Sequence, residues 1–147
     1  MARSIVAVIV SYLAMFALTF LGFTGLYLLM GPNQAFKPSS YMASNRWIAS
    51  AFGVYLVIAI IGGLICAAIA RGGKAPLVLA IVVLALGLVL AIPSMIAHQA
   101  DPHAVRVGPI SNFEAMQKAQ EPIWVPFTFP LIGVAGVLIG AKLKKRR

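Results

Sequence analysis

Three potential metal ligands lie close together in the sequence. His98, Asp101 and His103 fall within six residues, and imidazole and carboxylate groups are side chains that zinc and other transition metals bind. Their spacing matches no established metal-binding motif, Pro102 interrupts the segment, and no fourth ligand stands nearby. Solvated loop histidines are therefore the simpler interpretation, and a metal site at these three residues is the alternative.

Covalent catalysis needs a nucleophile beside a base, and the sequence offers no such pair. The only histidines are His98 and His103, whereas the single cysteine, Cys66, lies in an apolar stretch without a histidine nearby. A lone thiol also excludes an intramolecular disulfide and a cysteine-rich zinc site. Phosphate-binding loops and dinucleotide fingerprints are absent as well. We therefore expect a non-enzymatic protein without a cofactor.

The chain has four long apolar stretches, and none of them contains an aspartate, glutamate, lysine, arginine or histidine. A proton- or ion-coupled transporter needs such a group within the bilayer, so the sequence disfavours this class. A pathway for neutral or apolar solutes would instead use hydroxyl groups, for which the candidates are Tyr12, Thr19, Tyr55 and Thr128. Hydrogen bonding within and between helices is the simpler role of these hydroxyls.

The composition is that of a membrane protein. The chain has 147 residues, of which 61% are hydrophobic and only 10% are charged, against about 25% charged in a typical soluble domain. The formal net charge is +9, but five of the twelve basic residues fall in the last six positions. This charge is a terminal tail rather than a distributed surface, so nucleic acid is not expected as a partner.

The apolar stretches predict four transmembrane helices, at residues 4–29, 47–70, 75–97 and 123–141. Each is long enough to cross a hydrocarbon core of about 30 Å, with some variation in tilt. Outside these helices lie two outer loops, 30–46 and 98–122, a basic turn at 71–74 and a basic tail, 142–147. We therefore expect an all-α membrane protein, a single membrane domain whose four helices form a bundle.

Proline and serine positions predict local features of these segments. Pro93 predicts a kink or an early stop in the third helix, and Pro126 and Pro130 predict a bent or irregular first half of the fourth. Ser111 and Glu114 have the spacing of a capping box, which predicts a short amphipathic helix in the second outer loop. This helix would rest on the membrane surface, or alternatively act as a lid or a docking element.

Basic residues are unevenly divided between the two sides of the predicted membrane. Eight fall on the side of both termini and four on the other, which predicts that both termini are cytoplasmic. Trp47 and Trp124 begin two helices on the outer side, as aromatic residues at an interface would. The basic residues expected to fix this topology and to attract anionic lipid are Arg71, Lys74, Lys142, Lys144, Lys145, Arg146 and Arg147.

Small residues recur at helical spacing in three of the predicted helices. They are Ala59, Gly63 and Ala67 in the second, Gly87 and Ala91 in the third, and Gly136 and Gly140 in the fourth. Such stripes let helices approach closely, either inside one bundle or between copies in an oligomer, and the sequence leaves both possibilities open. The expected partners are the lipid bilayer and other membrane proteins or a second copy of this chain.

Three segments carry a resemblance to a group of known proteins. Residues 1–12, the stretch from Gly62 to Arg71, and the stretch from Gly133 to Lys142 resemble small uncharacterised four-span bacterial inner-membrane proteins. The resemblance implies a multi-pass protein of the bacterial inner membrane. It implies no activity, cofactor or site residue.

Two functions follow from these observations. The absence of catalytic and cofactor motifs, together with the small-residue stripes, favours an accessory, assembly or scaffolding component of the inner membrane. The alternative is a small oligomeric channel or facilitator for neutral or apolar solutes.

Overall fold

A computed structural model describes residues 2–71, 73–100 and 105–145. The regular elements of these residues are all helices: α1 (Ala2–Met30), α2 (Pro32–Ala35), α3 (Asn45–Ala70), α4 (Ala75–Ala100), α5 (Asn112–Lys118) and α6 (Trp124–Lys145). Within the described chain, α1, α3, α6 and the first part of α4 are long and apolar enough to span a membrane. The structure therefore fits a multi-pass membrane protein.

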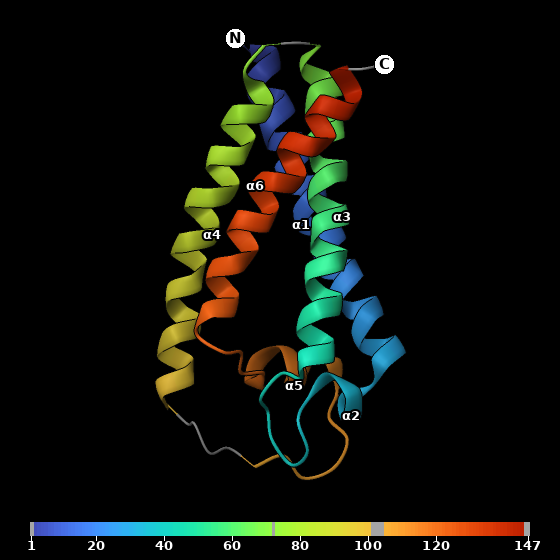
Figure 1. Cartoon of the computed structure of the whole chain (residues 1–147), viewed down its shortest axis with the longest axis vertical. Coiled ribbons are helices and arrows are strands. Elements are labelled where there is room, and N and C mark those ends of the chain that lie inside the picture. Colours follow the sequence, from blue (N-terminus) through green and yellow to red (C-terminus); the bar gives the residue numbers. More distant parts are fainter. Residues whose placement is uncertain (1, 72, 101–104, 146–147) are drawn as a thin grey trace.

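The four long helices run along one common axis, with both chain termini at the same end (Figure 1). We call this the terminal end; the opposite end, which carries α2 and α5, is the loop end. Helices α3 and α6 pack on each other, while α1 packs on α3 and α4 packs on α6. Toward the loop end, Figure 1 shows α4 on the left and the second half of α1 on the right.

Glycines bring α3 and α6 into very close contact. A Cβ atom on Gly63 would overlap the carbonyl oxygen of Val137, and one on Gly140 would overlap that of Ile60. Only a hydrogen atom fits at either position. Because lipid tails are as apolar as the side chains, helices in a membrane attract each other through such close packing rather than through the hydrophobic effect.

The other small residues of the predicted stripes occupy several environments. A Cβ on Gly136 would meet Ala59 of α3, and a Cβ on Gly87 of α4 would meet the ring of Pro130 of α6. Ala91 is buried, whereas Ala67 is half-buried at the terminal end.

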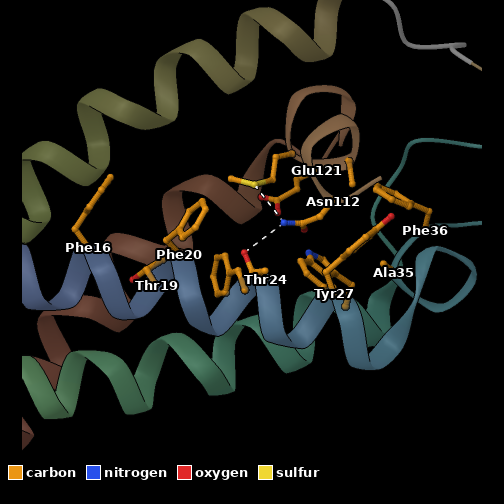
Figure 2. A pocket seen from close by; sticks show the side chains of 13 residues that line it. Phe16, Thr19, Phe20, Thr24, Tyr27, Ala35, Phe36, Asn112 and Glu121 are labelled. Atoms are coloured by element: carbon orange, nitrogen blue, oxygen red, sulfur yellow. Dashed lines mark hydrogen bonds between the residues drawn. The ribbon is translucent and has the colours of Figure 1, made fainter. Parts of the chain in front are cut away.

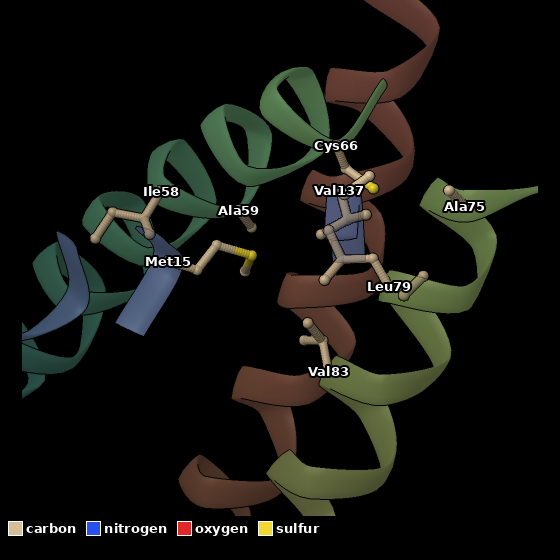
Figure 3. Packing of buried hydrophobic residues seen from close by; sticks show 10 residues of the cluster. Met15, Ile58, Ala59, Cys66, Ala75, Leu79, Val83 and Val137 are labelled. Carbon is tan, nitrogen blue, oxygen red and sulfur yellow. The ribbon is translucent and has the colours of Figure 1, made fainter. Parts of the chain in front are cut away.

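The main apolar core lies in the half of the molecule near the terminal end. Figure 3 shows Val137 of α6 between Cys66 of α3 and Leu79 of α4, and all three side chains are fully buried. Ala7 of α1 and Ala75 of α4 belong to the same cluster. The Cys66 thiol is thus enclosed by packing, which makes it unreactive toward reagents in water.

The prolines do not end or interrupt the helices, although an early stop and an irregular segment were among the outcomes that the sequence predicts. Helix α4 continues past Pro93 to Ala100, so the helix does not stop early. Helix α6 is continuous from Trp124 and contains both Pro126 and Pro130, so its first half is not irregular. Pro126 lies in the first turn, where the N–H has no acceptor within the helix. In hydrocarbon the remaining backbone groups have no partner outside the helix, which favours its continuation past a proline.

Helix α6 also extends beyond the predicted fourth span. Residues 142–145, expected as part of a basic tail, form its last turn. Cations in this position interact favourably with the negative end of the helix dipole. Arg146 and Arg147 lie outside the described residues.

We predict that Gly140→Ala weakens the fold by about 1–3 kcal/mol, because the added methyl group must push α3 and α6 apart. The control is Gly53→Ala, which adds a methyl group to α3 where no atom lies within 4 Å. Unfolding in mixed detergent micelles, followed by circular dichroism, measures both. Equal stabilities of the two variants would contradict the close approach of α3 and α6.

Candidate functional site

The structure does not test the predicted metal ligands. Asp101, His103 and the side chain of His98 fall outside the described part of the chain. Among residues whose placement is described, no three His, Cys, Asp or Glu side chains gather in a group suited to a metal ion. A metal site at His98, Asp101 and His103 therefore stays a prediction.

The two loops at the loop end fold onto each other and form a cap. The Ala43 amide donates to the Gln120 carbonyl at 2.7 Å, and the Gln120 amide donates to the Tyr41 carbonyl at 2.9 Å. The Tyr27 hydroxyl of α1 donates to the Ile110 carbonyl at 2.9 Å, which ties the cap to α1. These bonds place α5 beside the second half of α1.

Helix α5 begins at a serine cap and is held by an ion pair. The Ser111 hydroxyl accepts a hydrogen bond from the Glu114 amide at 3.2 Å, as the spacing of these residues predicts. Lys118 donates to Glu114 Oε1 at 3.0 Å, and this bond raises the pKa of Lys118. Because both side chains are exposed, the pair orients the surface of α5 but adds little stability.

A cavity of about 370 Å³ lies between α1 and α5. In Figure 2 the α1 side chains line one wall, whereas Asn112 and Glu121 line the other. Asn112 Nδ2 donates to the Thr24 hydroxyl at 3.3 Å across this space. The aromatic side chains of the cavity are Phe16, Phe20, Phe23, Tyr27, Phe36 and Trp47.

A second cavity, of about 260 Å³, adjoins the first and reaches α4. The two cavities share the lining residues Thr19, Phe23 and Glu121, so we treat them as one space and call it the aromatic groove. Phe16 at one edge is 69% exposed and Leu90 at the other is 66% exposed. The groove is therefore open on the side that would face lipid.

The aromatic rings of the groove support one another. The centroid of Trp47 lies 6.2 Å from that of Tyr27 and 6.3 Å from that of Phe23, both with edge-to-face geometry. Phe23 in turn lies 6.0 Å from Phe129 of α6, which lies 5.3 Å from Tyr55 of α3. Such pairs hold the rings in fixed orientations, so the apolar wall is already formed without a ligand.

Glu121 is the charged residue of the groove. Its side chain is half-buried, and burial raises the pKa of its carboxyl group above the ordinary value. No hydrogen bond or ion pair joins this carboxyl group to another residue of the described chain. A carboxylate that is removed from water without a partner can gain free energy by binding a cation.

Sequence reasoning missed this groove because it placed Glu121 in the outer loop 98–122, apart from the helices. Two signals were present. Glu121 directly precedes Pro122 and the fourth predicted helix, so its side chain starts close to the helices. Phe16, Phe20, Phe23 and Tyr27 are spaced by four, three and four residues, which places them on one face of α1.

The four hydroxyl residues of the predicted solute pathway are only partly brought together. Thr19 and Tyr55 line the aromatic groove. Tyr12 packs against the main apolar core instead. The Thr128 hydroxyl donates to the carbonyl of Trp124 in its own helix at 2.9 Å, which satisfies the hydroxyl locally.

Comparisons with protein families, with curated proteins and with solved structures find no match to this chain. The resemblance to small four-span inner-membrane proteins therefore stays an expectation. The function is inferred from the geometry of the molecule.

We predict that Glu121→Gln stabilises the ligand-free protein at pH 8 and has little effect at pH 4. Because the carboxyl pKa is raised by folding, the fold is penalised once pH exceeds the unfolded-state pKa, and the penalty is complete above the folded-state pKa. Glutamine carries no charge and removes this penalty. Thermal unfolding in detergent between pH 4 and pH 8 measures the difference.

The control for this prediction is Glu114→Gln. It removes the same charge at the same end, but it breaks the ion pair with Lys118 and relieves no burial. We expect it to leave the pH 8 stability unchanged or slightly lower. A lower unfolding midpoint for Glu121→Gln than for the unmodified protein at pH 8 would show that the carboxylate is already paired.

Proposed function

We propose that this protein is a non-enzymatic membrane protein that binds a cationic amphipathic molecule in the aromatic groove. The observation that carries the proposal is the unpaired carboxyl group of Glu121 in a mostly apolar space whose lining includes six aromatic side chains in its larger part. An amphipathic cation combines an apolar body, which suits the aromatic wall, with a charge that suits the carboxylate.

The size and openness of the groove support this assignment. Its two parts, of about 370 and 260 Å³, are of the size that holds small molecules in proteins. The exposed edges at Phe16 and Leu90 offer entry sideways from the hydrocarbon. A molecule already dissolved in the membrane would thus reach the groove without crossing water.

The position of the charge supports a cation in particular. Glu121 lies at the loop end, close to where a membrane surface would be, so a ligand could keep its charged group near water while its chain enters the groove. Trp47 and Phe23 line the same space, and aromatic faces attract alkylammonium groups. An anionic ligand would be repelled by Glu121, and a strongly polar neutral ligand would lose its hydration in the apolar groove without compensation.

We further propose that the four long helices form a bundle across a bacterial inner membrane, with both termini in the cytoplasm. The excess of basic residues at the terminal end supports this orientation. The aromatic groove then opens toward the outer half of the bilayer. The protein would act as a facilitator that takes up its ligand there.

This proposal extends the facilitator interpretation of the sequence from neutral or apolar solutes to amphipathic cations. The accessory or scaffolding role, in contact with other membrane proteins or with a second copy, stays a prediction. Crosslinking in native membranes distinguishes the two, because a scaffolding component is recovered together with stoichiometric foreign subunits.

The binding proposal is tested with single-tryptophan variants in nanodiscs of zwitterionic lipid. Trp124→Phe leaves Trp47, which lines the groove, and Trp47→Phe leaves Trp124, which is exposed outside it. We predict that a brominated alkyltrimethylammonium ion quenches Trp47 in a saturable way and quenches Trp124 only in proportion to its concentration in the lipid.

Glu121→Gln should weaken this binding roughly tenfold, or about 1.4 kcal/mol, because it removes the Coulombic attraction between the carboxylate and the quaternary ammonium group, which has no N–H to donate. Glu114→Gln, the matched loss of one negative charge at the same end, should change the affinity less than twofold. Affinity should fall as pH is lowered, since protonation removes the Glu121 charge, and the raised pKa moves this fall to higher pH than for an exposed glutamate.

Two results would contradict the proposal. One is equal affinity for the alkyltrimethylammonium ion and for a brominated neutral alcohol of the same chain length, which would favour apolar solutes. The other is indistinguishable quenching of Trp47 and Trp124, which would show that the ligand remains in the lipid.

A further inference from the structure

Basic residues from two distant segments meet in one cavity at the terminal end. The cavity has a volume of about 590 Å³ and lies between the turn that joins α3 to α4 and the last turn of α6. Five of its lining side chains are cations: Arg71, Lys74, Lys142, Lys144 and Lys145. We call this space the basic cavity.

The turn between α3 and α4 is shaped to place two of these cations. Arg71 ends α3 in the left-handed conformation, with φ of 51°, and its amide donates to the Ala67 carbonyl. Gly73 also has a positive φ, of 83°, a value that glycine adopts without strain. This tight reversal brings Lys74 next to the end of α6, and the continuation of α6 as a helix to Lys145 supplies the remaining cations.

The positive charge of the basic cavity is not neutralised by the described protein. Glu114 and Glu121, the two carboxylates among the described residues, both belong to the loop end. No ion pair joins any of the five cations to a residue within 2–71, 73–100 or 105–145. Cations held around one space repel each other, so an anion placed among them would be bound favourably.

An apolar groove begins at the same place. A space of about 290 Å³ lies between the first turns of α1 and of α4, and its apolar lining includes Ile5, Ile9 and Val78. Lys74 lines both this groove and the basic cavity. The positively charged cavity therefore adjoins an apolar surface that runs along the helices. A lipid could contact both parts, whereas a free inorganic anion would contact the cations alone.

We propose that the basic cavity binds the headgroup phosphate of an anionic phospholipid, one acyl chain of which lies in the groove between α1 and α4. The site needs both parts: cations at the membrane surface hold the phosphate, and Ile5, Ile9 and Val78 contact the chain. It lies at the end of the molecule opposite the aromatic groove, so it does not depend on the proposed function.

The test measures the binding of dioleoyl phosphatidylglycerol and dioleoyl phosphatidylcholine to the detergent-purified protein by native mass spectrometry. We expect phosphatidylglycerol to be retained at one molecule per chain and phosphatidylcholine to be lost at the same collision energy. The double variant Lys74→Gln, Lys142→Gln should bind phosphatidylglycerol about 30-fold more weakly, at roughly fivefold per cation.

The matched control is the double variant Lys37→Gln, Arg46→Gln. It also removes two positive charges, but from a separate surface depression at the loop end. We expect less than a twofold change. An equal loss of affinity in the two double variants would overturn the proposal, because it would show that only net charge matters.

Competition with inorganic phosphate separates a lipid site from an ion site. If the acyl chain contributes, 10-fold excess phosphate should leave phosphatidylglycerol bound. Displacement of the lipid by phosphate, or equal retention of phosphatidylcholine, would overturn the assignment. A groove variant, Val78→Asn, gives an independent check: it should weaken phosphatidylglycerol binding while it leaves all five cations in place.

Discussion

The close approach of α3 and α6 is the contact on which the rest of the molecule depends. Gly63 and Gly140 leave no room for a side chain between the two backbones, so these helices form a tight central pair. Helices α1 and α4 then attach to opposite partners, α1 to α3 and α4 to α6. They converge near Ala7 and Ala75 at the terminal end, where the main core lies. Toward the loop end α1 and α4 separate, and the aromatic groove is the space that opens between them.

Each end of this arrangement has a cavity with charged lining residues, and the charges of the two cavities are opposite in sign. At the loop end, the cap brings Glu121 against the mouth of an apolar groove, whereas at the terminal end five cations surround a second cavity. In the membrane orientation proposed above, each charged group lies near a membrane surface, where water and headgroups lower the cost of its charge. Each also adjoins an apolar groove between α1 and α4. Both sites thus match molecules that have a charged head and an apolar chain, with opposite head charges.

Hydropathy and capping patterns predicted the four long helices and α5, since both are local properties of the sequence, but they did not predict the short helix α2. Four long apolar helices are present, and Ser44 and Ser111 cap α3 and α5. Helix α6 is continuous through Pro130 although an irregular segment was one of the two predicted outcomes, because in hydrocarbon a freed backbone carbonyl finds no water. A bend at this proline stays a prediction. The cap formed by the two loops at the loop end, and the aromatic groove beside it, could not be predicted in the same way. They depend on pairing between loops about eighty residues apart, such as Ala43 with Gln120, for which local sequence carries no signal.

The position of Glu121 shows why a search for ionisable residues inside apolar stretches can miss a charged site. A charge at the centre of a membrane helix costs about 2.5–3.5 kcal/mol or more, so helices rarely contain one. A loop residue next to the first turn of a helix avoids most of that cost, because its backbone stays near the surface. Its side chain can still reach a groove between the helices, as the carboxyl group of Glu121 does. The residues that flank a membrane helix, and the loops that fold over it, therefore need the same attention as the helix itself.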